Sequence, residues 1–162
     1  MASCLLTCLL LASDCCTLAA PAWGQQHTYQ FSAYPVAKRF RGPTATPQLR
    51  PGTAAWQFRT RIREAAKGNP NFAGHYILAS WGCGAECLLS VIIDARTGKV
   101  YFPGFTNCCW YSIAALKNTT EVEPIAFRLT SSLVVFSGLL NEAGPTGPHY
   151  FKFEHGRLVA LP

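Results

Sequence analysis

The sequence predicts an α+β fold, in which one helix packs on a face of an antiparallel β-meander of five to seven strands. Three observations support this prediction. Helical spacing of apolar residues is clear in one segment only, which begins at Thr53. Short apolar segments bounded by turn residues fill the chain after Asn71. Most of these segments are joined by connections short enough for hairpins, so neighbours in sequence are expected to pair.

The first 22 residues have the pattern of a cleaved signal peptide. Cys4 to Ala12 form an uncharged, mostly apolar run, and Ala20-Pro21-Ala22 fits the small-x-small cleavage rule. The run stops at Ser13 and Asp14, short of the ~20 apolar residues of a spanning helix. We therefore expect a periplasmic or secreted protein, not an integral membrane protein.

The rest of the chain divides into a lead-in, residues 23–52, and a single α+β domain, residues 53–162. The lead-in has little periodicity and contains Pro35, Pro43, Pro47 and Pro51, which predicts an extended segment wrapped over the domain. Its aromatic residues Tyr29, Phe31 and Tyr34 favour one short strand within it.

The domain begins with the predicted helix. Phe58, Ile62 and Ala65 fall on one helical face, and Gly68 with Pro70 supplies the stop signal. Strands are expected at 75–81, 87–95, 99–103, 124–130, 132–140, 149–154 and 157–162.

The turns between these strands follow from local chemistry. Residues 94–98 form a short hairpin loop in which Gly98 takes positive φ, and His155-Gly156 suits a two-residue primed turn. Two long loops, Gly104 to Glu123 and Asn141 to Pro148, are the places where binding is expected.

The basic charge is concentrated between residues 38 and 67, where Glu64 is the single acid. Removal of Asp14 with the signal peptide raises the formal net charge from +6 to +7. Such a face suits an anionic cell-wall polymer or lipid surface, although a solvated helix side is the simpler explanation of the charges. Nucleic acid is a poor partner because no stacking motif accompanies the charge. The basic residues are Lys38, Arg39, Arg41, Arg50, Arg59, Arg61, Arg63 and Lys67.

Export would leave four cysteines, Cys83, Cys87, Cys108 and Cys109, which are most simply interpreted as two disulfides. The stretch 81–87, WGCGAEC, places its two cysteines at the tips of consecutive strands, within reach of a disulfide. Its flanking glycines, Gly82 and Gly84, permit a tight backbone, and Trp81 is expected to cover the bond.

Three other roles for these thiols remain open. A four-thiolate zinc site has poor spacing, because adjacent cysteines rarely point at one metal. A redox pair would lack the usual Cys-x-x-Cys at a helix N-terminus. A thiol-dependent enzyme would pair Cys83/Cys87 or Cys108/Cys109 with His75 as the base. No nucleophile elbow, Walker loop or HExxH pattern is present, so we expect no cofactor, no metal and a binding function.

The expected contact surface is the closed loop with the Phe105–Tyr111 segment beside it. The partner would be an envelope or extracellular protein or an anionic cell-wall polymer. Core packing remains the alternative for the aromatic residues. The binding candidates are Trp81, Gly82, Gly84, Glu86, Phe105, Trp110, Tyr111 and His75.

Three segments carry a resemblance to a group of small, largely uncharacterised exported bacterial proteins: NFAGHY at 71–76, WGCGAEC at 81–87 and IDARTGKV at 93–100. The likeness spans most of residues 35–162 and implies no activity. A fainter likeness concerns the periplasmic inhibitors of vertebrate lysozyme, in which a disulfide-closed loop plugs the enzyme cleft. It implies that Glu86 is offered to the partner. This loop is one residue shorter, lacks that family's histidine and belongs to a basic chain, which a basic lysozyme would repel.

Overall fold

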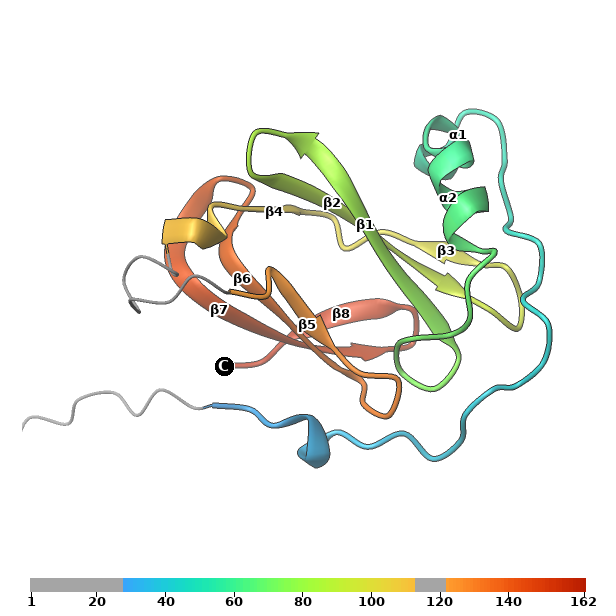
Figure 1. The fold of residues 1–162 in the computed structure, drawn as a ribbon, viewed down its shortest axis with the longest axis horizontal. Coiled ribbons are helices and arrows are strands. Elements are labelled where there is room, and N and C mark those ends of the chain that lie inside the picture. Colours follow the sequence, from blue (N-terminus) through green and yellow to red (C-terminus); the bar gives the residue numbers. More distant parts are fainter. Residues whose placement is uncertain (1–27, 113–121) are drawn as a thin grey trace, which may run out of the picture.

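A computed structural model describes residues 28–112 and 122–162 of the chain. The predicted signal peptide, residues 1–22, lies outside the described residues, as does the middle of the predicted loop from Gly104 to Glu123. One 3₁₀ turn, two short helices and eight strands lie wholly within the described part, and residues 110–112 are helical as well (Figure 1). Their bounds are η1 Phe31–Ala33, α1 Ala54–Gln57, α2 Arg59–Ala65, β1 Tyr76–Gly84, β2 Cys87–Asp94, β3 Val100–Tyr101, β4 Thr106–Cys108, β5 Ile125–Phe127, β6 Leu133–Leu140, β7 Ala143–Glu154 and β8 Arg157–Ala160.

The strands form one antiparallel sheet with the order β1-β2-β4-β6-β7-β8, while β3 pairs with β2 and β5 pairs with β6. The predicted antiparallel pairing of neighbouring segments is confirmed, but the count of five to seven strands and the simple meander are wrong. The additional strand is β4, which inserts between β2 and β6. Its three residues, Thr106–Cys108, have no alternating apolar pattern that would have revealed them.

The predicted turns are confirmed where local sequence dictates them. Gly98 has φ 74°, and the His155-Gly156 turn has positive φ at both residues, 51° and 79°. The predicted loop Asn141–Pro148 is wrong. Asn141 and Glu142 alone form the turn, with φ values of 53° and 59°, and β7 begins at Ala143.

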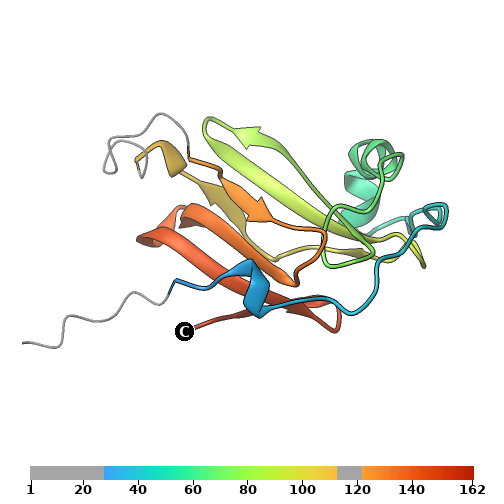
Figure 2. The same ribbon diagram turned by 60° about the horizontal axis from the view of Figure 1, so that its bottom comes forward.

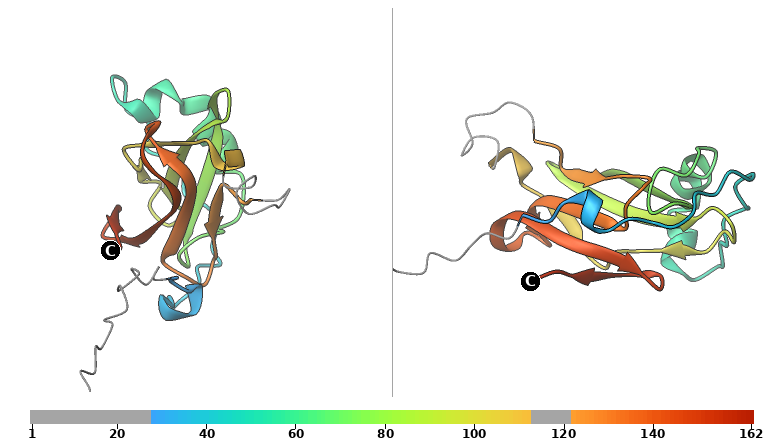
Figure 3. Two further views of the ribbon diagram at one scale, coloured as in Figure 1. Left: turned by 90° about the vertical axis from the view of Figure 1, so that its left-hand side faces the viewer. Right: turned by 90° about the horizontal axis from the view of Figure 1, so that it is seen from below.

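The sheet folds back on itself, so that β1 and β2 lie across β5, β6 and β7 (Figure 2). Side chains from both layers meet in the main core, where Ile92 from β2 and Val134 and Phe136 from β6 are at most 1% exposed. The end-on view in Figure 3 shows the two layers side by side.

The outer face of β1 and β2 is covered by α1 and α2, not by the single predicted helix. The chain is not helical at Phe58, where φ is −99° and ψ is 19° and where α1 ends and α2 begins. The predicted apolar face is nevertheless buried, since Ile62 is fully buried in a second cluster with Ile77 and Val91.

Residues 28–52 of the lead-in, here called the strap, follow the surface in a mostly extended conformation. Its backbone N–H groups donate to the domain at several points, including Val36 to the carbonyl of Thr130 (3.0 Å) and Phe40 to that of Gly74 (2.8 Å). The short strand expected near Phe31 is replaced by the 3₁₀ turn η1. Within the described ranges, no helix has the length and apolarity needed to cross a membrane.

Candidate functional site

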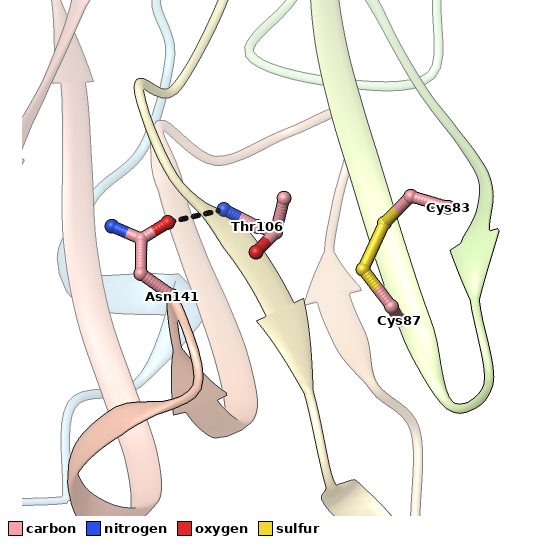
Figure 4. Close-up of a disulfide and its surroundings, with 4 residues drawn as sticks. All are labelled: Cys83, Cys87, Thr106 and Asn141. Carbon is pink, nitrogen blue, oxygen red and sulfur yellow. Dashed lines mark hydrogen bonds between the residues drawn. A yellow bond between two sulfur atoms is a disulfide. The ribbon is translucent and has the colours of Figure 1, made fainter.

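A disulfide between Cys83 and Cys87 closes the tip of the β1–β2 hairpin, with Cα atoms 5.2 Å apart (Figure 4). Gly84 pairs directly with Cys87, so Ala85 and Glu86 form the turn. Residues 82–85 are exposed. The predicted covalently closed loop is confirmed, and it projects from the sheet. Because both sulfurs are bonded to each other, neither is a thiolate available to zinc.

The second expected disulfide is absent: Cys108 and Cys109 are free thiols. Cys108 is 2% exposed, and this burial, together with its neighbour Cys109, raises the pKa of its thiol to about 11. Cys108 lies directly opposite Cys87 across the β2–β4 pair, and Cys87 is already bonded to Cys83. The four described cysteines therefore gather at one corner, where Cys83 and Cys87 are oxidised and Cys108 and Cys109 are not.

Glu86 joins the closed loop to the segment after β4. Its carboxylate Oε1 accepts a hydrogen bond from the backbone N–H of Tyr111 at 2.7 Å. Its carbonyl oxygen accepts another from the N–H of Cys109 at 3.2 Å. The carboxylate expected to face a partner is thus directed at the chain itself. The expectation that the loop and this segment lie side by side is met.

The aromatic residues of that segment separate into two groups. The rings of Trp110 and Tyr111 lie 5.6 Å apart, and Tyr111 is 62% exposed. Phe105 instead packs in the main core against Phe136 and Phe151, at ring distances of 5.0 and 5.2 Å. Tyr111 is therefore presented to solvent beside the closed loop, whereas the core-packing alternative holds for Phe105.

Trp81 packs against Phe58, with ring centroids 5.4 Å apart, and so belongs to the cluster beneath the helices. A Cβ built on Gly82 would meet nothing closer than 4.0 Å, so this glycine is not required by crowding.

His75 lies just before β1, at the end opposite to the closed loop. The eight residue-to-residue steps from His75 to Cys83 span roughly 25 Å of extended chain. The imidazole is thus too distant to act as a base for either thiol of the disulfide pair. Its ring packs against Tyr76 in a tilted arrangement with centroids 4.0 Å apart, and Nε2 lies 3.9 Å from Oδ1 of Asp94. Burial, followed by the charge of Arg96, lowers the pKa of His75, while Asp94 acts in the opposite direction.

An open cleft of about 440 Å³ surrounds His75, and sequence reasoning missed it. Four segments distant in sequence build it: the strap, the start of β1, the β2–β3 turn and the β7–β8 turn. Two segments singled out in the sequence, NFAGHY and IDARTGKV, both contribute residues to its lining, and this was the one sequence feature that pointed to it. We refer to it as the His75 cleft; its lining is Pro35, Val36, Ala37, Lys38, Ala73, His75, Tyr76, Arg96, Ser132, Phe153, Glu154 and His155.

A second pocket of about 200 Å³ opens where the chain between β3 and β4 leaves β2, and Phe102, Pro103 and Phe105 line it. Its rim is fixed by Asn141, whose Oδ1 accepts from the N–H of Thr106 at 3.0 Å (Figure 4). Among the described residues, no group of three His, Cys, Asp or Glu side chains is placed to hold a metal ion.

Comparison with protein-family models, curated proteins and solved structures gives no match to this chain. Functional inference therefore starts from the geometry of these sites.

Proposed function

We propose that the protein is an exported, non-catalytic binding protein that recognises an envelope or extracellular protein through one surface. This surface, the loop surface, consists of residues 82–86 and 109–111. The observation that carries the proposal is the hydrogen bond from the backbone N–H of Tyr111 to Glu86. It fixes an exposed tyrosine beside a covalently closed turn.

Rigidity before binding supports this proposal. The disulfide restricts residues 83–87, and two hydrogen bonds from residues 109 and 111 tie the neighbouring segment to the same turn. A surface that is already ordered loses little conformational entropy on association, so more of its contact energy appears as affinity.

Composition supports it as well. Tyr111 is 62% exposed and stands next to the half-buried Trp110. Tyrosine and tryptophan are enriched among the residues that dominate binding energy at protein interfaces. An inhibitor-like role, in which the turn enters a concave site of the partner, fits the small exposed residues Gly82, Gly84 and Ala85 at its tip.

Site-specific photo-crosslinking in the native compartment tests the proposal. A photoreactive residue at Tyr111 or at Ala85 should give the same discrete adduct, and one at the exposed Thr60 on α2 should not. The double variant Cys83→Ser/Cys87→Ser should weaken both adducts, because it releases the turn. Identical adducts from all three positions, or adducts unaffected by the double variant, would contradict the proposal.

A further inference from the structure

The His75 cleft is not used by the loop surface, which lies at the other end of β1. Two of the three segments singled out in the sequence nevertheless meet there. Residues 71–76 supply Ala73, His75 and Tyr76, and residues 93–100 supply Arg96. The two segments are distant in sequence, and folding brings their side chains into one cleft.

Hydrogen-bond donors dominate that chemistry. Lys38 enters from the strap, Arg96 from the β2–β3 turn and Tyr76 from β1. The lining contains one acid, Glu154, and its Oε2 is held by Nζ of Lys152 at 2.6 Å. Lysine and arginine side chains only donate, so the cleft is suited to a ligand rich in acceptors.

A buried atom beneath the surface of the cleft lacks a hydrogen-bond partner among the described residues. Nε2 of His75 has no hydrogen bond to any described residue, although its side chain is only 18% exposed. The nearby Asp94 is engaged in its own turn, where its oxygens accept from the N–H of Arg96 and the hydroxyl of Thr97, both at 2.9 Å. Nε2 has almost no accessible surface, so an anion in the cleft would act on the imidazole through its charge and not through a direct hydrogen bond.

The walls of the cleft are fixed in the absence of a ligand. Gly74 has φ 81°, and a Cβ at this position would collide with the carbonyl oxygen of Lys38, so the strap lies directly on the backbone. The N–H of Ala95 donates to the carbonyl of His75 at 3.0 Å, which holds the β2–β3 turn against the same region. Binding would therefore require little reordering of the backbone.

We infer that the His75 cleft binds a compact oxyanion, a carboxylate or a phosphate group. Lys38 and Arg96 supply the charge and the hydrogen bonds, and the imidazole of His75 lies beside the bound group. The volume of about 440 Å³ exceeds the needs of a bare ion. Val36 and Phe153 give the remaining space an apolar wall for the body of the ligand.

The bound anion should make affinity depend on pH through His75. The charge of an oxyanion beside the imidazole favours the imidazolium, so binding raises the pKa of His75 and affinity increases as the pH falls from 8 to 5. Sulfate is the suitable probe for this test, because a phosphate group itself titrates near pH 6. The titratable and charged groups around His75 are Lys38, Tyr76, Asp94, Arg96, Glu154 and His155.

The test is an NMR titration of the full chain with phosphate, acetate or sulfate, each against chloride at matched ionic strength. Saturable shifts of the His75 ring and the Arg96 amide are expected beyond those of chloride. The stronger of the phosphate and acetate arms identifies the anionic group. Arg96→Gln and Lys38→Gln should each weaken binding by about fivefold. Arg63→Gln is the matched control, since Arg63 on α2 is exposed and does not line the cleft.

Two results would overturn the inference: shifts no larger than those of chloride, or equal weakening by Arg63→Gln and Arg96→Gln, which would indicate a diffuse charge effect. An unchanged pKa of His75 in saturating sulfate would exclude an anion bound beside the His75 imidazole. Repeating the titration with Cys83→Ser/Cys87→Ser separates this site from the loop surface, because the anion should still bind.

Discussion

The backbone N–H of Tyr111 donates to the carboxylate of Glu86 across 25 residues of sequence, at a distance of 2.7 Å. This bond orders the segment after β4 against the closed turn of the β1–β2 hairpin. It is also why Glu86 is a positioning residue of the loop surface and not a group directed at the partner.

Replacing Glu86 should loosen this segment without unfolding the protein. Glu86→Ala removes the acceptor, at a cost of about 1 kcal/mol, so exchange of the Tyr111 amide hydrogen should accelerate by about fivefold. Glu86→Gln keeps an acceptor oxygen and should behave nearly as wild type. Hydrogen exchange followed by NMR gives the comparison. An unchanged exchange rate in Glu86→Ala would show that the bond does not order the segment.

The two free thiols should differ in reactivity. The pKa of Cys108 is raised from 9.0 to about 11, which leaves about a hundredfold fewer thiolates at neutral pH. Iodoacetamide should therefore modify Cys109 first in the folded protein, and both thiols equally in denaturant. Peptide mass mapping after timed labelling measures the two rates. Equal rates in the folded protein would contradict the burial of Cys108.

Burial of Cys108 should also appear in the pH dependence of stability. Its pKa is higher in the folded than in the unfolded chain, so its stabilising effect is complete below about pH 9 and is lost as the pH rises towards 11. Denaturant unfolding of wild type and Cys108→Ala at several pH values isolates this effect. If the two proteins lost stability in parallel over this window, another group would be responsible.

Removal of an aromatic side chain should destabilise the fold when the residue lies in the core, and should have little effect when the residue lies at the loop surface. Phe136 is fully buried between Phe105 and Phe151, so Phe136→Ala should lower the free energy of unfolding by about 3–5 kcal/mol. Tyr111→Ala should change it by less than about 0.5 kcal/mol, because Tyr111 is mostly exposed. Urea titration measures both. A large destabilisation by Tyr111→Ala would place this residue in the fold instead of at the loop surface.

The insertion of β4 beside β6 depends on Gly138. Its φ is 123°, and a Cβ there would collide with the carbonyl oxygen of Cys108. Gly138→Ala should therefore destabilise the protein by more than about 3 kcal/mol. Gly144→Ala is the control: φ is also positive, 85°, but a Cβ would meet open space, so backbone strain alone costs about 1–2 kcal/mol. Thermal unfolding of both variants should show this order, and equal losses would mean that strain, not crowding, limits Gly138.

The sequence predicts correctly those elements whose determining residues lie within a few positions of one another. Gly98 and the His155-Gly156 pair dictate their turns, and Cys83 and Cys87 are close enough along the chain to be joined at a hairpin tip. The helical spacing that ends near Ala65 predicts the buried face of α2 but not the break at Phe58. The strand β4 is too short to show a period, and its pairing comes entirely from β2 and β6.

The sequence by itself determined the alternating strands, their hairpins, the closed loop and the basic character of the chain, because each depends on residues a few positions apart. Only the tertiary structure decided that Phe105 enters the core, that Glu86 holds Tyr111, and that His75 faces Lys38 and Arg96 in a cleft. These placements depend on contacts between distant segments, and the folding of the sheet onto itself sets them. A local sequence pattern does not determine which residue, distant in sequence, a side chain will contact.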